Sequence, residues 1–175
     1  MTATMPPRLP ALVAALLVLV LSCGEVRAAE ALSTGPSGLP LPRFVSLGSS
    51  EVNVRVGPSQ RHRVKWTFRK RGLPVEIVAE FGNWRRVRDS DGEEGWVHGA
   101  LLSGERTALV TPWGGDLVPL RPSPRSGAAP VALLEPLVLA SVEGCDGSWC
   151  RVEISRLRGV VPQRDLWGVY PREEF

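Results

Sequence analysis

The chain contains an internal repeat, and this repeat limits the fold more than any other feature of the sequence. The segment VNVRVGP at residues 52–58 has a degraded copy, VPLRPSP, at residues 118–124. Further along, GNWRRV at residues 82–87 corresponds to GSWCRV at residues 147–152. The matched segments follow one another in the same order in both halves. We therefore predict two copies of one fold, each of about 60 residues.

Short apolar segments separated by turn residues predict that both copies consist of β-strands. The chain of 175 residues contains 18 Gly and 16 Pro, which is rich in turn residues but below the range of low-complexity sequences. In the first copy Val52, Val54 and Val56 alternate with polar residues, as in a strand with one buried face. Asp91-Gly92 is a typical tight turn between two strands.

This strand spacing predicts an all-β chain with two tandem small barrels, at residues 43–102 and 108–170. A unit of about 60 residues buries only about 60% of the surface that its unfolded chain exposes, so two such units gain stability by packing together. The connection at residues 103–107 is too short to let them move freely. We therefore expect one compact body.

The N-terminus has the features of an export signal. Residues 11–21 form an unbroken apolar run, which is the length of a signal-peptide core and shorter than the roughly 20 residues of a membrane span. Val26-Arg27-Ala28 fits cleavage before Ala29, so residues 1–28 are predicted to be removed. The mature protein is then periplasmic or secreted, with no transmembrane segment. Alternatively, Cys23 anchors it as a lipoprotein. Residues 29–42 are expected to be a flexible leader.

If the protein is exported, its cysteines lie in an oxidising compartment. The chain has three, and only Cys145 and Cys150 remain after cleavage. An even number of cysteines in an oxidising compartment favours a disulfide. The turn between them corresponds to the turn at residues 81–85 of the first unit, so we predict a Cys145–Cys150 bond across a hairpin of the second unit, with a structural role.

Catalytic, metal and nucleic-acid functions find little support. The histidines, His62 and His98, both lie in the first unit, away from both mature cysteines. Spacings typical of zinc or nucleotide sites are absent from the sequence, so no metal, cofactor or catalytic residue is predicted. The formal charge of +3 does not favour nucleic-acid binding. The acidic residues around residues 89–94 and the basic run at residues 69–71 are interpreted as solvated turns, with Ca²⁺ and an anionic ligand as the respective alternatives.

NVRVGP, GNWRRV and GWV followed by a short turn resemble the bacterial SH3-like domain, and the chain is similar to exported tandem SH3-like proteins of Gram-negative bacteria. The second unit departs from the pattern, with Pro119 in place of the Asn, Ser123 in place of the Gly and Val160 in place of the second Trp. The resemblance implies a β-barrel recognition module, often connected with the cell wall or with wall-active enzymes.

The six tryptophans are the most informative candidates for a binding surface. In a regular strand Trp84 and Val87 lie on opposite faces, so an inward Val87 places Trp84 outside. The same argument places Trp149 outside and Cys150 inside. A bulge at residues 82–83 would reverse the assignment for Trp84. Trp66, Trp96 and Trp167 are expected to pack at the barrel or between the units.

Three functional hypotheses follow. The leading one is a non-catalytic binding module for a peptide, a peptidoglycan fragment or an envelope protein, with candidate ligand-binding residues Trp84, Arg55, Trp96 and Arg86. The alternative is a structural or interaction protein whose two barrels pack together with no open groove. An enzyme is the weakest hypothesis, because a cell-wall hydrolase domain has no room in the chain.

Overall fold

Alternating burial along short segments builds the first repeat as a β-sheet. The computed structural model describes residues 2, 33–124, 127 and 129–175. In β4 the side chains of Val52 and Val54 are fully buried, and Asn53 and Arg55 are only partly covered. The strands of the first repeat, followed along the sheet, are β5 (Val64–Phe68), β4 (Val52–Arg55), β8 (Glu94–His98), β7 (Trp84–Arg88), β6 (Pro74–Phe81), β3 (Arg43–Leu47) and β9 (Leu102–Ser103).

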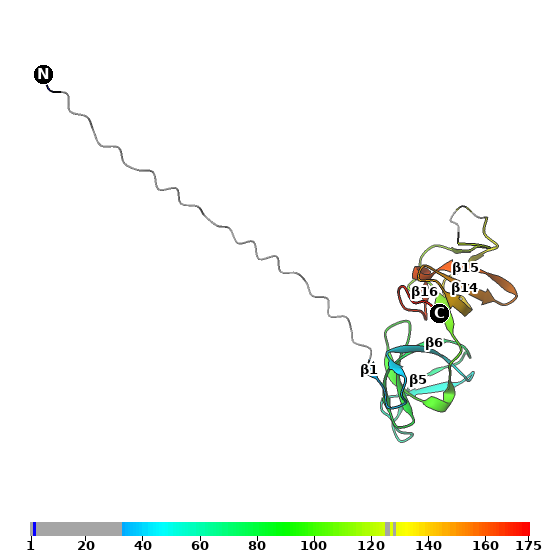
Figure 1. Ribbon diagram of the computed structural model, residues 1–175. Helices are drawn as coiled ribbons and strands as arrows, with labels where there is room; N and C mark the ends of the chain where they lie inside the picture. The colour runs from blue at the N-terminus through cyan, green and yellow to red at the C-terminus, as the bar shows by residue number, and fades with distance from the viewer. Residues whose placement is uncertain (1, 3–32, 125–126, 128) are drawn as a thin grey trace. The chain divides into compact units, whose positions relative to one another are not determined.

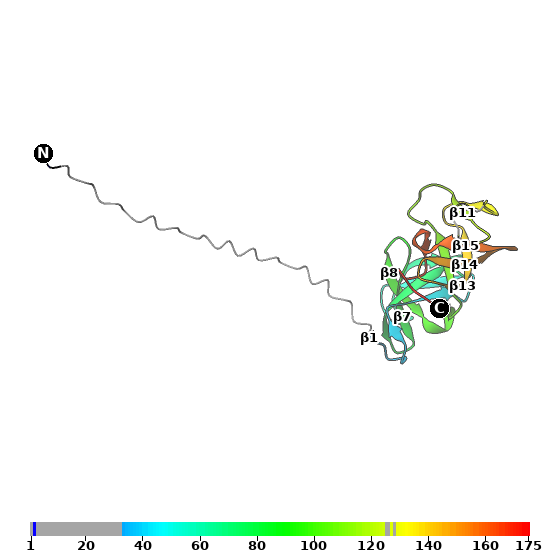
Figure 2. The same ribbon diagram turned by 45° about the horizontal axis from the view of Figure 1, so that its top comes forward.

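The second repeat has the same strand order. It consists of β12 (Ala132–Leu134), β11 (Val118–Leu120), β15 (Leu157–Pro162), β14 (Trp149–Ile154), β13 (Leu139–Cys145), β10 (Thr107–Val110) and β16 (Leu166–Trp167), where a bridge between Arg121 and Val160 joins β11 to β15. Near its end each repeat contains one short 3₁₀ turn, η1 (Gly99–Leu101) in the first and η2 (Gln163–Asp165) in the second. Figures 1 and 2 show the two groups of strands. The predicted all-β class with two tandem repeats is confirmed.

Gly95 and Gly159, at equivalent positions of the two repeats, show why the fold needs a glycine at this point. Gly95 lies where β8 crosses β4, and a Cβ there would collide with the side chain of Val54. Gly159 occupies the same place in the second repeat, where a Cβ would lie 2.6 Å from the carbonyl oxygen of Arg121. Each repeat has its own core of mostly aliphatic side chains. The two glycines therefore serve the same purpose, which is to let two strands cross closely over a small core.

The segment before the first repeat differs from the expected flexible leader. Residues 33–41 form a small hairpin of β1 (Ser33–Thr34) and β2 (Pro40–Leu41), and Leu41 is buried in the first core. Ser37 donates from its backbone N and its Oγ to the carboxylate of Glu80, at 2.8 Å and 2.9 Å. These contacts connect residues 43 positions apart, which is why local composition did not predict them.

Glu80 is the centre of a buried ion-pair cluster. Its side chain is fully buried, and its Oε1 lies 2.7 Å from Arg43 Nη2 and 3.1 Å from Arg85 Nε. Burial alone raises the pKa of Glu80, but the hydrogen bonds from Arg43 and Ser37 and the charge of Arg85 outweigh it and lower the pKa to about 2. The cluster holds the leader hairpin and the β6–β7 hairpin together.

The predicted disulfide joins Cys145 and Cys150, whose Cα atoms are 4.1 Å apart. These residues pair across β13 and β14 in the register that Glu80 and Arg85 occupy across β6 and β7. The same place in the fold is therefore secured by an ion pair in the first repeat and by a covalent bond in the second.

The residues after β16 connect the second repeat to the first. Leu32–Phe175 form one compact unit. Phe44 of β3 lies edge-on to Trp167, and their ring centroids are 5.2 Å apart. The ring centroids of Phe44 and Tyr170 are 4.8 Å apart. Tyr170 Oη donates to Glu76 Oε1 at 2.9 Å. Burial, and then the charge of Glu76, raise the pKa of Tyr170, so its hydroxyl keeps the proton that this hydrogen bond needs.

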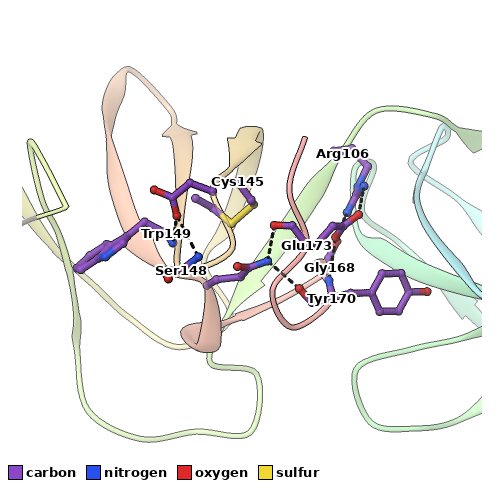
Figure 3. The surroundings of a disulfide bond; sticks show 10 residues. Arg106, Cys145, Ser148, Trp149, Gly168, Tyr170 and Glu173 are labelled. Atoms are coloured by element: carbon purple, nitrogen blue, oxygen red, sulfur yellow. Dashed lines mark hydrogen bonds and ion pairs between the residues drawn. A yellow bond between two sulfur atoms is a disulfide. The ribbon is translucent and has the colours of Figure 1, made fainter. Parts of the chain in front are cut away.

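The C-terminal tail, residues 168–175, is also fixed to the second repeat (Figure 3). Arg106 Nη1 lies 2.9 Å from Glu173 Oε1, and the Arg106 guanidinium lies 4.5 Å from the centre of the Phe175 ring. The backbones of Cys145 and Phe175 exchange two hydrogen bonds of 3.2 Å. The tail therefore contacts the disulfide hairpin on one side and the first repeat on the other.

Apart from residue 2, the predicted signal peptide of residues 1–28 lies outside the described residues, as do its cleavage site and Cys23. Within the described part of the chain, no helix is long and apolar enough to span a membrane.

Candidate functional site

Three neighbouring strands of the first repeat bring the four candidate residues to one face of the sheet. Trp84 and Arg86 lie on β7, Trp96 lies on β8 and Arg55 lies on β4. Trp96 pairs with Arg86 on one side and with Arg55 on the other. Val54, Val87 and Val97, which are the chain neighbours of Arg55, Arg86 and Trp96, are buried in the core, so all four candidates share the outer face.

The parity prediction for Trp84 is correct. Val87 is fully buried, Trp84 is half-buried, and the pairing of β7 with β8 runs without interruption from Trp84–His98 to Arg88–Glu94. The register shift in this region lies in β6, between Ile77 and Ala79. The alternative, a bulge at residues 82–83 that turns Trp84 inward, is therefore excluded.

Trp84 lines two hollows on the outer face. The larger has a volume of about 520 Å³ and is bordered by the turn at residues 81–83 and by the loop at residues 58–61. The smaller, of about 120 Å³, is lined also by Arg55, Asn53 and Leu101. Gln60 and His98 border both hollows together with Trp84. We call this pair of hollows the Trp84 groove.

Local hydrogen bonds fix the walls of the Trp84 groove. The rings of Trp84 and His98 meet edge to face, with centroids 5.4 Å apart. His98 Nδ1 accepts a hydrogen bond of 3.3 Å from the backbone N of Ala100, which holds the imidazole at the start of η1. Arg55 Nη1 donates to the carbonyl oxygen of His62 at 2.7 Å and so supports the loop at residues 58–61. These bonds hold the imidazole and the loop at the edges of the groove.

Arg86 and Trp96 share the face but do not line the groove. Arg86 Nη2 forms an ion pair of 2.6 Å with Glu94 Oε2, and Trp96 is half-buried beside it. The structure thus brings Trp84 and Arg55 together in one concave site and leaves the other two candidates on the adjoining surface.

Sequence reasoning missed His98, Gln60 and Asn53 as groove residues. A signal for His98 was available, because His98 follows Trp96 by two positions on the same strand and therefore lies on the same face. Gln60 had no such signal, since it lies in a loop whose course depends on contacts such as Arg55–His62.

Two other tryptophans pack as expected. Trp66 packs on the first core and meets Phe68 edge to face at 5.9 Å. Trp167 packs on Phe44 between the repeats.

The acidic residues around residues 89–94, for which Ca²⁺ binding was the alternative interpretation, have structural partners. Asp89 Oδ1 accepts hydrogen bonds from the backbone N atoms of Asp91 and Glu93, which is the usual arrangement of a tight turn. Glu93 Oε2 forms an ion pair of 2.6 Å with Lys65. Among the described residues, no group of His, Cys, Asp and Glu is placed to hold a metal ion.

The strand order and the outer groove define the class of the protein as a tandem all-β domain with a concave aromatic surface. Residues 48–104 and 114–168 each match the family described as the bacterial SH3 domain. These two segments cover more than half of the chain, and the protein belongs to this family.

No curated protein matches the sequence. Among solved structures, the chain is similar to "Structure of NlpC2 from Trichomonas vaginalis", with 12% identity and a TM-score of 0.33 over 72% of this chain and 48% of that one. It is also similar to "Structure of NlpC1 from Trichomonas vaginalis", with 14% identity and a TM-score of 0.32 over 77% of this chain and 48% of that one. The chain thus spans about half the length of the solved structures that it matches.

Proposed function

We propose that the protein is an exported, non-catalytic binding module that takes a peptide or a cell-wall-derived ligand, or an envelope protein partner, in the Trp84 groove. The domain boundaries in this proposal are residues 43–102 and 108–170. The observation that carries it is the half-buried Trp84 beside His98, on a concave face that also presents Arg55. A partly exposed Trp in a concavity offers a large apolar surface with a polar N–H, which suits amphipathic ligands.

Membership of the bacterial SH3 family supports a recognition module. The polar groups of the groove support the choice of a peptide or wall fragment, because Asn53, Gln60 and the Arg55 guanidinium offer both donors and acceptors to amide and carboxylate groups. Cys145 and Cys150 share a disulfide, so neither provides a thiol nucleophile.

A second function, as a structural connector, is favoured by one observation. Phe44, Trp167 and Tyr170 are used in the contact between the repeats. Trp84, by contrast, lines the groove of the first repeat, and for this reason we rank ligand binding ahead of the structural role.

Sedimentation of the purified mature protein with isolated peptidoglycan sacculi, together with a pull-down from envelope extract, tests the proposal. We expect wild type to be captured by one of these two materials. Trp84→Ala should reduce capture at least about tenfold, in the range of a hot-spot residue.

Leu157→Ala is the matched control, because Leu157 is an exposed apolar residue of the second repeat at 44% exposure. It should be captured like wild type. If Trp84→Ala and Leu157→Ala are both folded and Trp84→Ala is captured as well as wild type, the groove is not the binding site. Absence of capture in both assays would favour the structural connector.

The export part of the proposal has its own measurement. Mass spectrometry of the envelope fraction should find a mature N-terminus at or near Ala29. A lipid-modified N-terminal Cys23 would instead establish the lipoprotein alternative.

A further inference from the structure

A larger cavity lies where the second repeat, the tail and the first repeat meet. Its volume is about 740 Å³, within the range of about 300–1,000 Å³ typical of small-ligand pockets. Its aromatic walls come from distant parts of the chain: Phe44, Trp113, Trp149, Trp167 and Tyr170. We call it the Trp149 cavity. Its position differs from that of the Trp84 groove, which belongs to the first repeat alone.

The Trp149 cavity occupies the place that the Trp84 groove has in the first repeat. Trp149 pairs with Pro162 as Trp84 pairs with His98. The backbone N of Gln163 donates to the carbonyl oxygen of Ser148 at 2.8 Å, which corresponds to the same bond from Gly99 to Asn83. The second repeat therefore keeps the groove position, although its sequence departs from the family pattern elsewhere.

Two additions enlarge this position and make it more apolar. The segment between β10 and β11 carries Trp113, which is 62% exposed and has no counterpart in the first repeat. The tail residue Tyr170 and the first-repeat residue Phe44 supply a further wall. Figure 3 shows Trp149 at the disulfide hairpin and Tyr170 on the tail.

Gln163 fixes the tail at the wall of the cavity. Gln163 is only 5% exposed and lines the cavity, and its Nε2 donates to the carbonyl oxygens of Tyr170 and Glu173 at 2.7 Å and 3.1 Å. Its Oε1 is buried and has no hydrogen-bond partner among the described residues. The two bonds from Nε2 hold the tail, which carries Tyr170, against η2 at the wall of the cavity.

The charged side chains at the edge of the cavity favour a ligand with a negative charge. Arg164, with a side chain that is 85% exposed, and Arg172, which is also exposed, lie at its edge. The acidic residue of the lining, Glu76, already accepts the hydrogen bond of Tyr170 and lies 3.4 Å from Arg88. Arg164 Nε also lies 3.8 Å from Asp165 Oδ1, and this long, exposed ion pair offsets part of the Arg164 charge. A carboxylate on the ligand therefore finds Arg172 and the exposed Arg164 guanidinium at the edge.

We propose that the Trp149 cavity is a second binding site, which takes an extended apolar peptide segment of a partner protein with an Asp or Glu side chain next to it. Apolar side chains such as Pro or Leu fill the aromatic walls, in the manner of aromatic-lined grooves that hold extended peptides. The acidic side chain lies against Arg164 and Arg172.

An array of blocked hexapeptides with Pro- and Leu-rich centres, flanked by either Glu or Lys, tests this proposal on the mature protein. Wild type should retain Glu-flanked apolar peptides in preference to Lys-flanked ones. Trp113→Ala, which removes an exposed side chain and should leave the fold intact, should weaken the retained peptides at least about tenfold. Arg164→Glu should reduce the preference for Glu over Lys by about twofold to fivefold, as expected of an exposed charge.

Leu157→Ala is the matched control, because Leu157 is exposed and does not line the Trp149 cavity, and it should retain the same peptides as wild type. Failure of sacculus capture leaves this peptide result unaffected, so the two proposals fail separately. The proposal is overturned if Glu-flanked and Lys-flanked peptides are retained equally. It is also overturned if Trp84→Ala rather than Trp113→Ala abolishes retention, or if tetra-N-acetylglucosamine binds in a manner that Trp113→Ala removes while the peptides do not bind.

Discussion

Single residues explain why the two repeats share one fold despite their divergence. The motif positions Gly95 and Gly159 are needed because another strand passes directly over them. Their role is visible only in the structure, since the sequence does not show what a Cβ would meet. The outward direction of Trp84 did follow from the sequence, because parity along a strand is a local property.

Gly159→Ala should destabilise the protein by about 1–3 kcal/mol, as overpacking does in a tight core. The new Cβ would lie 2.6 Å from the Arg121 carbonyl oxygen and 2.8 Å from Leu120 Cδ1, and the backbone atom cannot move aside cheaply. Urea unfolding measures the change. Gly104→Ala is the control, because a Cβ at Gly104 meets no atom within 4 Å. Equal stability of the two variants would contradict the crossing-strand explanation.

Glu80 gives the first repeat a defined pH dependence. Its pKa in the folded protein is about 2, below the ordinary 4.5, so its contribution to stability is present above pH 4.5 and is lost as the pH falls toward 2. Glu80→Gln should cost on the order of 3 kcal/mol at pH 6. The difference between the variant and wild type should shrink as the pH falls to 2. Urea unfolding at both pH values measures it, and a pH-independent difference would show that the Arg43–Glu80–Arg85 charges contribute nothing.

Among the hairpins, the sequence predicted the turn at residues 145–150 and its disulfide, because equivalent positions in the repeat and an even cysteine count are visible without a structure. The leader hairpin at residues 33–41 was not predictable in the same way. Its order depends on Glu80, which lies 43 positions away from Ser37 in the chain.

Reduction of the Cys145–Cys150 bond should destabilise the second repeat by about 2 kcal/mol, because the bond closes a short loop. The loss should also loosen the tail, since the backbone of Cys145 pairs with that of Phe175. Hydrogen exchange of the reduced and oxidised protein measures both effects. Faster exchange confined to the first repeat would contradict this assignment, and free thiols in protein purified from the periplasm would remove the bond itself.

For the molecule as a whole, the sequence predicted two repeats in one compact body but not how they are connected. The contact depends on Phe44, Trp167 and Tyr170, and the Trp149 cavity depends on Trp113 as well. These residues lie far apart in the chain, and no local pattern associates them.

The mature protein should unfold in a single calorimetric transition. Deletion of residues 170–175 should separate this transition into two, because it removes the Tyr170–Glu76 hydrogen bond and the Arg106–Glu173 ion pair. Tyr170→Phe is the milder comparison, since it keeps the ring on Phe44 and should cost only about 1 kcal/mol. Two transitions in the full-length mature protein would show that the repeats are independent.

The indole N–H signals of the six tryptophans test ligand binding in the Trp84 groove most directly. Soluble peptidoglycan fragments from digested sacculi, and separately the envelope partner if the pull-down finds one, are added to ¹⁵N-labelled mature protein. The Trp84 signal is identified by its loss in Trp84→Phe. We predict that this signal shifts with at least one of the two ligands. A Trp84 signal that stays in place while the protein binds either ligand would contradict the account.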